Sequence, residues 1–349
     1  MKNEWQRSTV RDIPLYYNPK VKGLRMDTST NPLGANPSAA RVLRECAEMD
    51  LNQYPSPYSD GLREELARLY GLKADNFVVG NGSDEVLDVA FKSFMEPGAT
   101  VLMPYPSYSL HGYFVKVNCG RVRTVDLTSG FQLDVGSMLK EKAQMLILCT
   151  PNNPTSNTFR RTDVEALLEG FDGPVIVDEA YGEFAGLSLI PDIESFPNLI
   201  VTRTFSKAYA LAGMRIGYSV SSLEAAAVMQ RVRIPYSLNR ISERIAIEAL
   251  RNQDFVKNSV ETVRKGRAQL ERGLKALGLK VYPSEANFIL FKVPVGSARL
   301  VKALEEKGVM IRDFGRLRLL EDCVRTTIGT REMNELLLDK LKEALQECL

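Results

Sequence analysis

The chain has 349 residues, of which 44% are hydrophobic and 25% are charged. This length exceeds what one hydrophobic core usually fills, and the composition is that of a soluble globular protein rather than a disordered or membrane-embedded one. The formal net charge of +2 gives no reason to expect nucleic acid as a partner.

In the first two thirds of the chain, short apolar runs alternate with segments of helical spacing. Several of these runs are apolar throughout, as expected of strands that helices cover on both faces of a mostly parallel sheet. Helices are predicted at residues 61–70 and 83–95, and Thr162-Asp163-Val164-Glu165 resembles a capping box that would open another helix. Strands are predicted at residues 77–79, 100–103, 122–125, 145–149, 175–177, 199–202 and 216–220.

The pattern changes after about residue 250. A long charged amphipathic helix is predicted at residues 254–277, with further helices at 298–307 and 331–346 and strands at 280–282, 288–292 and 324–328. We therefore expect a large α/β domain at residues 46–250 and a small α+β domain at 251–349. Residues 1–45 form an N-terminal arm and part of the small domain. The arm shows no clear element and is expected to pack on that domain or on a partner subunit.

The cysteines and the N-terminus bear on the compartment. The five cysteines are scattered, with no C-x-x-C pair, which argues against a disulfide framework or a structural zinc site. Charged residues interrupt the first 25 positions, so no uncharged signal core is expected there. No later window approaches the roughly 18 consecutive apolar residues of a membrane span. We expect a cytoplasmic protein with no metal site and no membrane partner.

A lysine in a small loop after a strand is the most informative feature. Lys207 follows Ser206 directly and precedes Arg215 by eight residues. Burial and neighbouring cations lower the pKa of an amine and make it nucleophilic towards an aldehyde, so this setting suits Schiff-base chemistry. Ser206 and Arg215 could offer a hydroxyl and a guanidinium to a phosphate. Alone, a Ser-Lys pair is more often a solvated surface feature, so the interpretation depends on the other motifs.

Two motifs follow buried strands upstream. Asp178 ends a predicted strand three residues before Tyr181; such an aspartate can keep a pyridine nitrogen protonated, and such a tyrosine can bind a phenolic oxygen. An acid after a strand is also a common helix N-cap. Asn153, in Pro151-Asn152-Asn153-Pro154, could donate to the same phenolic oxygen, with a rigid turn as the alternative.

The segment Gly80-Asn81-Gly82-Ser83-Asp84-Glu85 follows another predicted strand and opens a helix. Free backbone amides at a helix N-terminus bind phosphate. Glu85 replaces the third glycine of a dinucleotide fingerprint, so a lone phosphate fits better. Tyr108 follows the next strand and could stack on an aromatic cofactor, with a core position as the alternative. All these motifs follow predicted strand ends, where open α/β sheets place ligands.

These motifs resemble the fold-type I pyridoxal-phosphate aminotransferases, and most of all the histidinol-phosphate aminotransferase family. The resemblance covers nearly the whole chain. It implies a mostly parallel central sheet sandwiched by helices, a smaller α+β domain, pyridoxal 5′-phosphate bound in the large domain, and a homodimer. The matching stretches are Asn-Gly-Ser-Asp-Glu, Pro-Asn-Asn-Pro-Thr, Asp-Glu-Ala-Tyr-x-Glu-Phe, Arg-Thr-x-Ser-Lys-Ala-x-x-Leu-Ala-Gly-x-Arg-x-Gly-Tyr and Ser-Glu-Ala-Asn-Phe.

The resemblance also implies residue roles. Lys207 would hold the cofactor as a Schiff base and shuttle the substrate proton, while Asp178 pairs with the pyridinium. Arg325 would clamp the substrate carboxylate or phosphate, Arg312 would be a second arginine for the phosphate, and Tyr16 would assist it; surface charge is the alternative for both arginines. The remaining implied cofactor contacts are Asn153 and Tyr181 to the phenolic oxygen, Tyr108 on the ring, Ser83, Asp84, Ser206 and Arg215 to the phosphate, and Tyr54 to the phosphate from the other subunit.

The implied reaction transfers the amino group of histidinol phosphate to 2-oxoglutarate, giving imidazole acetol phosphate and glutamate, in histidine biosynthesis. Ser156 stands where the family has glycine, and His111, the only histidine, stands where it has a second tyrosine. We expect His111 to be a partly buried polar group, with binding of a substrate anion as the alternative.

One further departure concerns the substrate. Ser29-Thr30-Asn31-Pro32 stands where the family reads Asn-Glu-Asn-Pro, and with Leu33-Gly34 it also resembles threonine-phosphate decarboxylase. Decarboxylation of a phospho-amino acid therefore remains an alternative, as does transamination of an aromatic amino acid. A binding module without turnover is disfavoured by the intact Lys207 and its partners.

Overall fold

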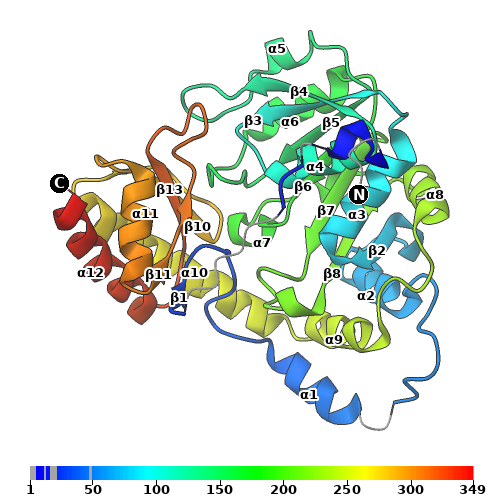
Figure 1. Cartoon of the computed structure of the whole chain (residues 1–349). Helices are drawn as coiled ribbons and strands as arrows, with labels where there is room; N and C mark the ends of the chain where they lie inside the picture. Colours follow the sequence, from blue (N-terminus) through cyan, green and yellow to red (C-terminus); the bar gives the residue numbers. More distant parts are fainter. Residues whose placement is uncertain (1–4, 12, 16–21, 47–48, 349) are drawn as a thin grey trace.

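A mostly parallel seven-stranded sheet forms the centre of the larger part of the molecule in the computed structural model, which describes residues 5–11, 13–15, 22–46 and 49–348 (Figure 1). The strand order is β2-β8-β7-β6-β5-β3-β4, and β8 alone runs in the opposite direction to the other strands of this sheet. This confirms the predicted fold class. The strands are β2 (Phe77–Asn81), β3 (Thr100–Tyr105), β4 (Arg121–Asp126), β5 (Met145–Cys149), β6 (Val175–Asp178), β7 (Leu199–Thr204) and β8 (Ile216–Ser221).

Two apolar cores cover the two faces of this sheet. Successive side chains of a strand point to opposite faces, so in β5 Ile147 belongs to one core while Leu146 and Leu148 belong to the other. The first core also contains residues of α3 (Gly82–Phe94), α4 (Ser109–Val117) and α8 (Leu223–Val232). The second contains residues of α2 (Asp60–Tyr70), α6 (Arg161–Gly170), α9 (Arg240–Arg251) and α10 (Gln253–Ala276). This double cover explains why the strands read as continuous apolar runs.

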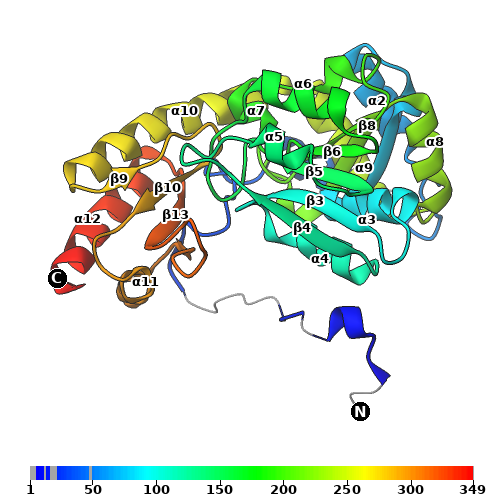
Figure 2. The same cartoon turned by 90° about the horizontal axis from the view of Figure 1, so that it is seen from above.

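The C-terminal part of the chain forms a separate antiparallel sheet with helices beside it. The strand order is β12-β13-β10-β9, and α10 runs from the large sheet to this part (Figure 2). β1 (Leu24–Arg25) pairs in parallel with β11 (Val309–Met310), which attaches the N-terminal segment to the C-terminal part. The other elements here are β9 (Lys280–Val281), β10 (Phe288–Lys292), β12 (Arg312–Asp313), β13 (Cys323–Thr327), α11 (Ser297–Glu306) and α12 (Arg331–Cys348).

Several local predictions differ from the structure. The predicted capping box is wrong, because α6 begins at Arg161 and its N-cap, Arg160, makes no side-chain cap hydrogen bond. The N-terminal arm does contain elements, since it includes α1 (Pro37–Glu45), whose N-cap Asn36 accepts a hydrogen bond from the Ser38 amide through its side chain. The remaining short elements are α5 (Val135–Met138), α7 (Gly182–Ala185) and the 3-10 turns Ser8–Val10, Ala74–Asn76, Ile190–Asp192 and Ala212–Met214. The domain boundaries at residues 45 and 250 stay predictions.

Within the described part of the chain, no helix combines the length and apolarity needed to cross a membrane. The same residues contain no group of three or more histidine, cysteine or acidic side chains that could hold a metal ion.

Candidate active site

The predicted site residues gather along one edge of the large sheet. Asn153 follows β5, Asp178 ends β6 and Lys207 follows β7. Since β8 runs antiparallel to β7, Arg215 reaches the same edge from the start of β8. Parallel strands thus bring together side chains that lie far apart in the sequence.

Asp178 is buried and held by hydrogen bonds on both carboxylate oxygens. Its Oδ1 accepts from the Thr202 hydroxyl and from the Ala180 amide, each at 3.2 Å. Its Oδ2 lies 3.1 Å from His111 Nε2, and the His111 ring is fully buried. His111 is therefore not the partly buried polar group that we expected, but a neighbour of Asp178. Its ring also meets the Tyr108 ring edge-on, with centroids 5.3 Å apart.

Tyr181, Asn153 and Arg325 form a buried hydrogen-bonded row. The Asn153 amide donates to the Tyr181 hydroxyl at 3.2 Å, and the Asn153 amide oxygen accepts from Arg325. Burial raises the pKa of the Tyr181 hydroxyl, which therefore stays protonated at neutral pH, although the charge of Arg325 opposes this shift. A neutral phenol and an amide offer hydrogen-bond donors to an anionic oxygen.

The start of α3 and the start of β8 lie close together and form a cradle between them. Arg215 donates to Asp84 at 2.8 Å. Gly82 has a φ of +82°, which L side chains rarely adopt, and a Cβ on Gly217 would lie 2.1 Å from the Ser83 amide nitrogen, so both positions need glycine. Ser206, buried at the adjacent strand end, donates its amide to the Thr204 hydroxyl. These residues fit a phosphate group, because a helix N-terminus and a guanidinium meet there.

Lys207 has the character expected of a nucleophilic amine. Burial, followed by the charge of Arg325, lowers the pKa of its amine to about 8. Its Nζ lies 5.6 Å from the centroid of the Tyr181 ring. The ammonium donates to two backbone carbonyls, those of Thr28 at 3.1 Å and Ser29 at 3.2 Å.

Two predicted substrate arginines lie side by side on neighbouring strands. Arg312 of β12 is paired directly opposite Arg325 of β13. Arg325 is buried and donates to the Asp27 carbonyl at 2.9 Å, but its Nε has no hydrogen-bond partner among the described residues. No acidic side chain within the described ranges forms an ion pair with Arg312 or Arg325. Burial lowers the pKa of Arg325, and the charge of Arg312 lowers it further.

The structure does not bring all predicted residues into this cluster. Tyr54 lies on the surface with 78% of its area exposed, and its ring is 4.9 Å from that of Tyr236. Tyr16 lies outside the described residues.

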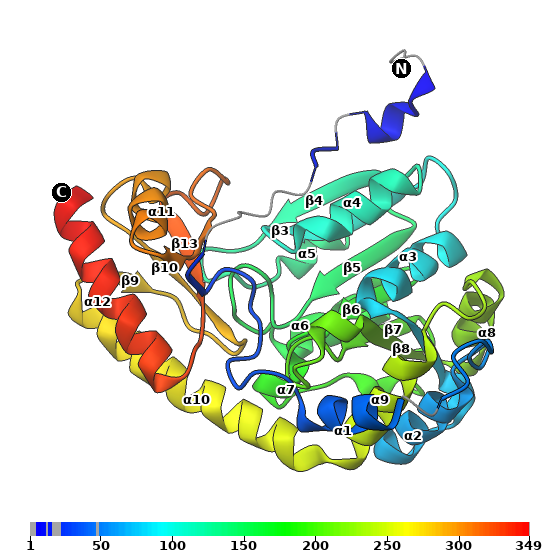
Figure 3. The ribbon, with the colours of Figure 1, turned by 60° about the horizontal axis from the view of Figure 1, so that its bottom comes forward.

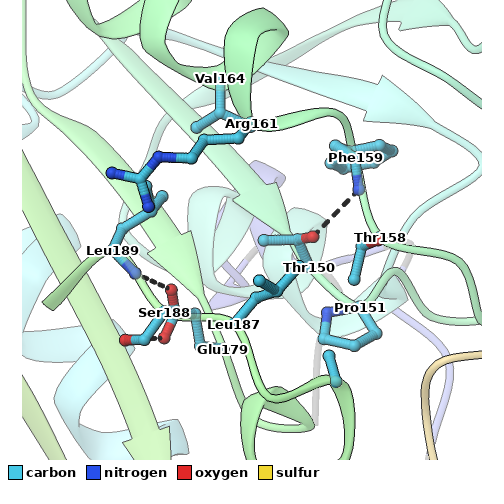
Figure 4. Close-up of a pocket in the computed structure, with 11 residues that line it drawn as sticks. Thr150, Pro151, Thr158, Phe159, Arg161, Val164, Glu179, Leu187, Ser188 and Leu189 are labelled. Carbon is cyan, nitrogen blue, oxygen red and sulfur yellow. Dashed lines mark hydrogen bonds between the residues drawn. The ribbon is translucent and has the colours of Figure 1, made fainter.

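A small pocket elsewhere shows what a structural polar cluster looks like in this fold. It is lined by residues that include Glu179, Ser188 and Leu189, and Figure 4 shows their polar atoms turned towards one another. Glu179 accepts from the Leu189 amide at 2.7 Å and from the Ser188 hydroxyl at 2.8 Å. The pocket contains none of the predicted site residues, and its carboxylate is satisfied by the protein, unlike Arg325 Nε.

The family model for aminotransferase class I and II matches residues 21–341. The chain belongs to the class I and II aminotransferases. A histidinol-phosphate aminotransferase from Caldanaerobacter subterraneus is 35% identical over 342 residues, which cover 96% of this chain and 95% of that protein.

Two solved structures of related enzymes share the fold of this chain. The histidinol-phosphate aminotransferase of Sinorhizobium meliloti, solved with pyridoxal 5′-phosphate, has a TM-score of 0.91 and 27% identity, with 99% of this chain and 98% of that chain covered. L-threonine-O-3-phosphate decarboxylase of Porphyromonas gingivalis has a TM-score of 0.83 and 25% identity, with 93% and 99% covered.

Contacts to Asp178 and to Lys207 in this aminotransferase site were not predicted from the sequence. His111 at Asp178 had a usable signal, because His111 follows Tyr108 by three residues and the intervening Ser109 opens α4. The Thr28 and Ser29 carbonyls at Lys207 had no such signal, because their position depends on how the N-terminal segment crosses the site.

Proposed function

We propose that this aminotransferase uses pyridoxal 5′-phosphate to transfer the amino group of histidinol phosphate to 2-oxoglutarate. The observation that indicates a phosphorylated substrate is the direct pairing of Arg312 with Arg325. Like charges directly opposite each other on neighbouring strands are destabilising. A substrate phosphate offsets this repulsion, and its several oxygens can accept from both guanidinium groups.

The names of relatives support the same substrate. The curated relatives at 35–36% identity across nearly the whole chain are histidinol-phosphate aminotransferases. The decarboxylase of Porphyromonas gingivalis also has a phosphorylated substrate in its name, so the arginine pair favours a phosphate without choosing between the two reactions.

Each residue has a physical task in the proposed reaction. When bound, pyridoxal 5′-phosphate supplies the aldehyde that takes up the amino group and a ring that withdraws electrons from the substrate. Asp178, oriented by Thr202 and His111, would accept the hydrogen bond of the ring nitrogen. Asn153 and Tyr181 would donate to the phenolic oxygen, and Tyr108 would pack against the ring.

The phosphate of the cofactor is assigned to the cradle of Ser83, Asp84, Ser206 and Arg215. Asp84 carries a negative charge, so we assign its backbone amide rather than its carboxylate to the phosphate. Lys207 would hold the cofactor covalently and would then move the proton of the substrate α-carbon. A pKa of about 8 leaves part of the amine neutral near neutral pH, which is the form that attacks an aldehyde or accepts a proton.

We also infer a cytoplasmic homodimer. Tyr54 is exposed with its ring next to that of Tyr236, and Ile234, two residues before Tyr236 in the sequence, is 67% exposed. Aromatic residues are enriched at interfaces, and a second subunit there would bury these side chains and bring Tyr54 to the phosphate of its partner. The five cysteines are unpaired in the structure, in keeping with a reducing compartment.

The experiment that tests the proposal combines one variant with a substrate panel. The purified protein should bind pyridoxal 5′-phosphate and turn over histidinol phosphate with 2-oxoglutarate, and Lys207→Ala should lose both the covalent link and turnover. Turnover only with an aromatic amino acid would reject the substrate. Release of carbon dioxide from threonine phosphate would reject the reaction.

A further inference from the structure

The backbone around Ser29 forms an unusual turn against Lys207. Ser29 has a φ of +52° and is 1% exposed. In an extended strand the backbone alternates, so successive groups point to opposite sides. Here the carbonyls of Thr28 and Ser29 both lie within 3.2 Å of the same Lys207 nitrogen. The left-handed conformation of Ser29 is what turns the chain so that both oxygens face the amine.

The turn is fixed by a residue of the C-terminal sheet, Thr327, and by Asn287, which directly precedes β10 of that sheet. The Ser29 amide donates to the Thr327 hydroxyl at 2.9 Å, and the Asn287 side chain donates to the Ser29 carbonyl at 2.9 Å. Arg325 donates to the Asp27 carbonyl next to the turn. Figure 3 shows the segment after β1, in blue, running from the C-terminal sheet past α7 to α1. The C-terminal part therefore holds this segment in place over Lys207.

The Ser29 side chain does not explain the conformation. Its hydroxyl is buried and has no hydrogen-bond partner among the described residues. A serine is less suited than glycine or asparagine to a left-handed backbone. The contacts made by this position instead come from its amide and carbonyl.

We propose that the Thr28 and Ser29 carbonyls bind the Lys207 ammonium during proton transfer. Ser29 is then a positioning residue, because its backbone conformation turns both carbonyls towards the lysine. This inference rests on the proposed catalytic role of Lys207. The neutral amine takes the proton from the substrate α-carbon, while the electron pair of that C–H bond stays with the substrate. The resulting ammonium donates to the Thr28 and Ser29 carbonyls, and it would then release the same proton to the carbon that had been the aldehyde carbon of the cofactor.

Charged and titratable groups face Lys207 from several elements, and some of them destabilise the ammonium that the two carbonyls bind. Arg325 and Arg215 disfavour the ammonium, whereas Asp84 and Asp178 favour it. The Tyr181 ring face also lies near the ammonium. An ammonium has donors and no acceptor, so two carbonyl oxygens stabilise it and keep the lysine basic enough to accept a proton despite its burial.

The test is the rate at which the full-length protein, freed of cofactor, captures pyridoxal 5′-phosphate at different pH values. Only the neutral amine attacks the aldehyde, so the midpoint of this profile reports the proton affinity of Lys207. Ser29→Val places a β-branched side chain where a left-handed φ is required. We expect its midpoint to move about one pH unit lower, a tenfold loss of proton affinity, because a hydrogen bond to the charge is lost. The primary isotope effect with α-deuterated glutamate should rise as well.

Two variants separate the turn from other effects. Ser29→Gly permits the left-handed backbone and removes only the side chain, so its midpoint should equal that of the wild type. Ser59 is buried with a φ of +55° and an unpartnered hydroxyl, so Ser59→Val imposes the same local strain without a contact to Lys207. Its midpoint should stay at the wild-type value.

An unchanged midpoint in Ser29→Val, or an equal shift in Ser29→Gly, would overturn the proposal. If Ser29→Val does not fold, Thr327→Val removes the acceptor of the Ser29 amide and should move the midpoint in the same direction; no shift there would also overturn it. Different results would contradict the proposed function. They are that Lys207→Ala still binds pyridoxal 5′-phosphate covalently, or that the wild-type protein does not turn over histidinol phosphate.

Discussion

Replacing Arg312 by glutamine should weaken phosphorylated substrates while stabilising the substrate-free protein. Arg312 and Arg325 are directly opposite each other across β12 and β13, and like charges in such a pair cost roughly 0.2–1 kcal/mol. An unfolding entropy of about 2.1 cal/mol/K per residue gives roughly 0.7 kcal/mol/K for this chain. The melting temperature of Arg312→Gln should therefore rise by roughly 0.3–1.4 °C.

The same variant should lose kcat/KM with histidinol phosphate. A hydrogen bond to a charged group contributes about 1.5–3 kcal/mol, which corresponds to a loss of roughly 10- to 150-fold. Glutamate carries no phosphate and should lose less. The matched control is Arg316→Gln, which removes the same charge from an exposed position of the following loop. Equal losses with both substrates, or a melting temperature below that of the wild type, would refute the assignment of Arg312 to the phosphate.

Three further predictions follow from buried groups. His111→Phe removes the partner of Asp178 Oδ2, so equilibrium titration of the cofactor-free protein should show roughly tenfold weaker binding of pyridoxal 5′-phosphate, and an unchanged affinity would contradict this role. Because the pKa of Lys207 is lowered to about 8, the wild-type rate of cofactor capture should rise with pH through about 8; a midpoint near that of a free lysine would contradict the burial. Arg203→Met leaves Glu179 buried without its 2.7 Å ion pair, and urea unfolding should show a loss of about 3–5 kcal/mol, whereas Arg123→Met, at an exposed ion pair, should leave the stability nearly unchanged.

The strands of the large sheet could be predicted because burial on both faces leaves a strong sequence signal. Val175, Ile176 and Val177 are all fully buried, and such a run has few other interpretations when turns flank it. The helix α4 gave no comparable signal, since Ser109–Val117 is short and contains glycine and β-branched residues. Its packing in the core with α3 and α8 decides its conformation.

The site divides in a similar way. Lys207, Asp178 and Asn153 could be placed together because each lies at or soon after the end of a strand of one mostly parallel sheet. The pairing of Arg312 with Arg325 could not be predicted, because β12 has only two residues and its register comes from tertiary contacts. The left-handed φ of Ser29 likewise depends on Thr327 and Asn287, which lie more than 250 residues away in the sequence.

The most direct test of the proposed function is to add histidinol phosphate, without any oxo acid, to the protein loaded with pyridoxal 5′-phosphate and to follow its visible absorption. We predict that the cofactor converts to its amino form and that 2-oxoglutarate then restores the original spectrum. A spectrum that ignores histidinol phosphate but responds to an aromatic amino acid would contradict the substrate, and carbon dioxide released from threonine phosphate would contradict the reaction itself.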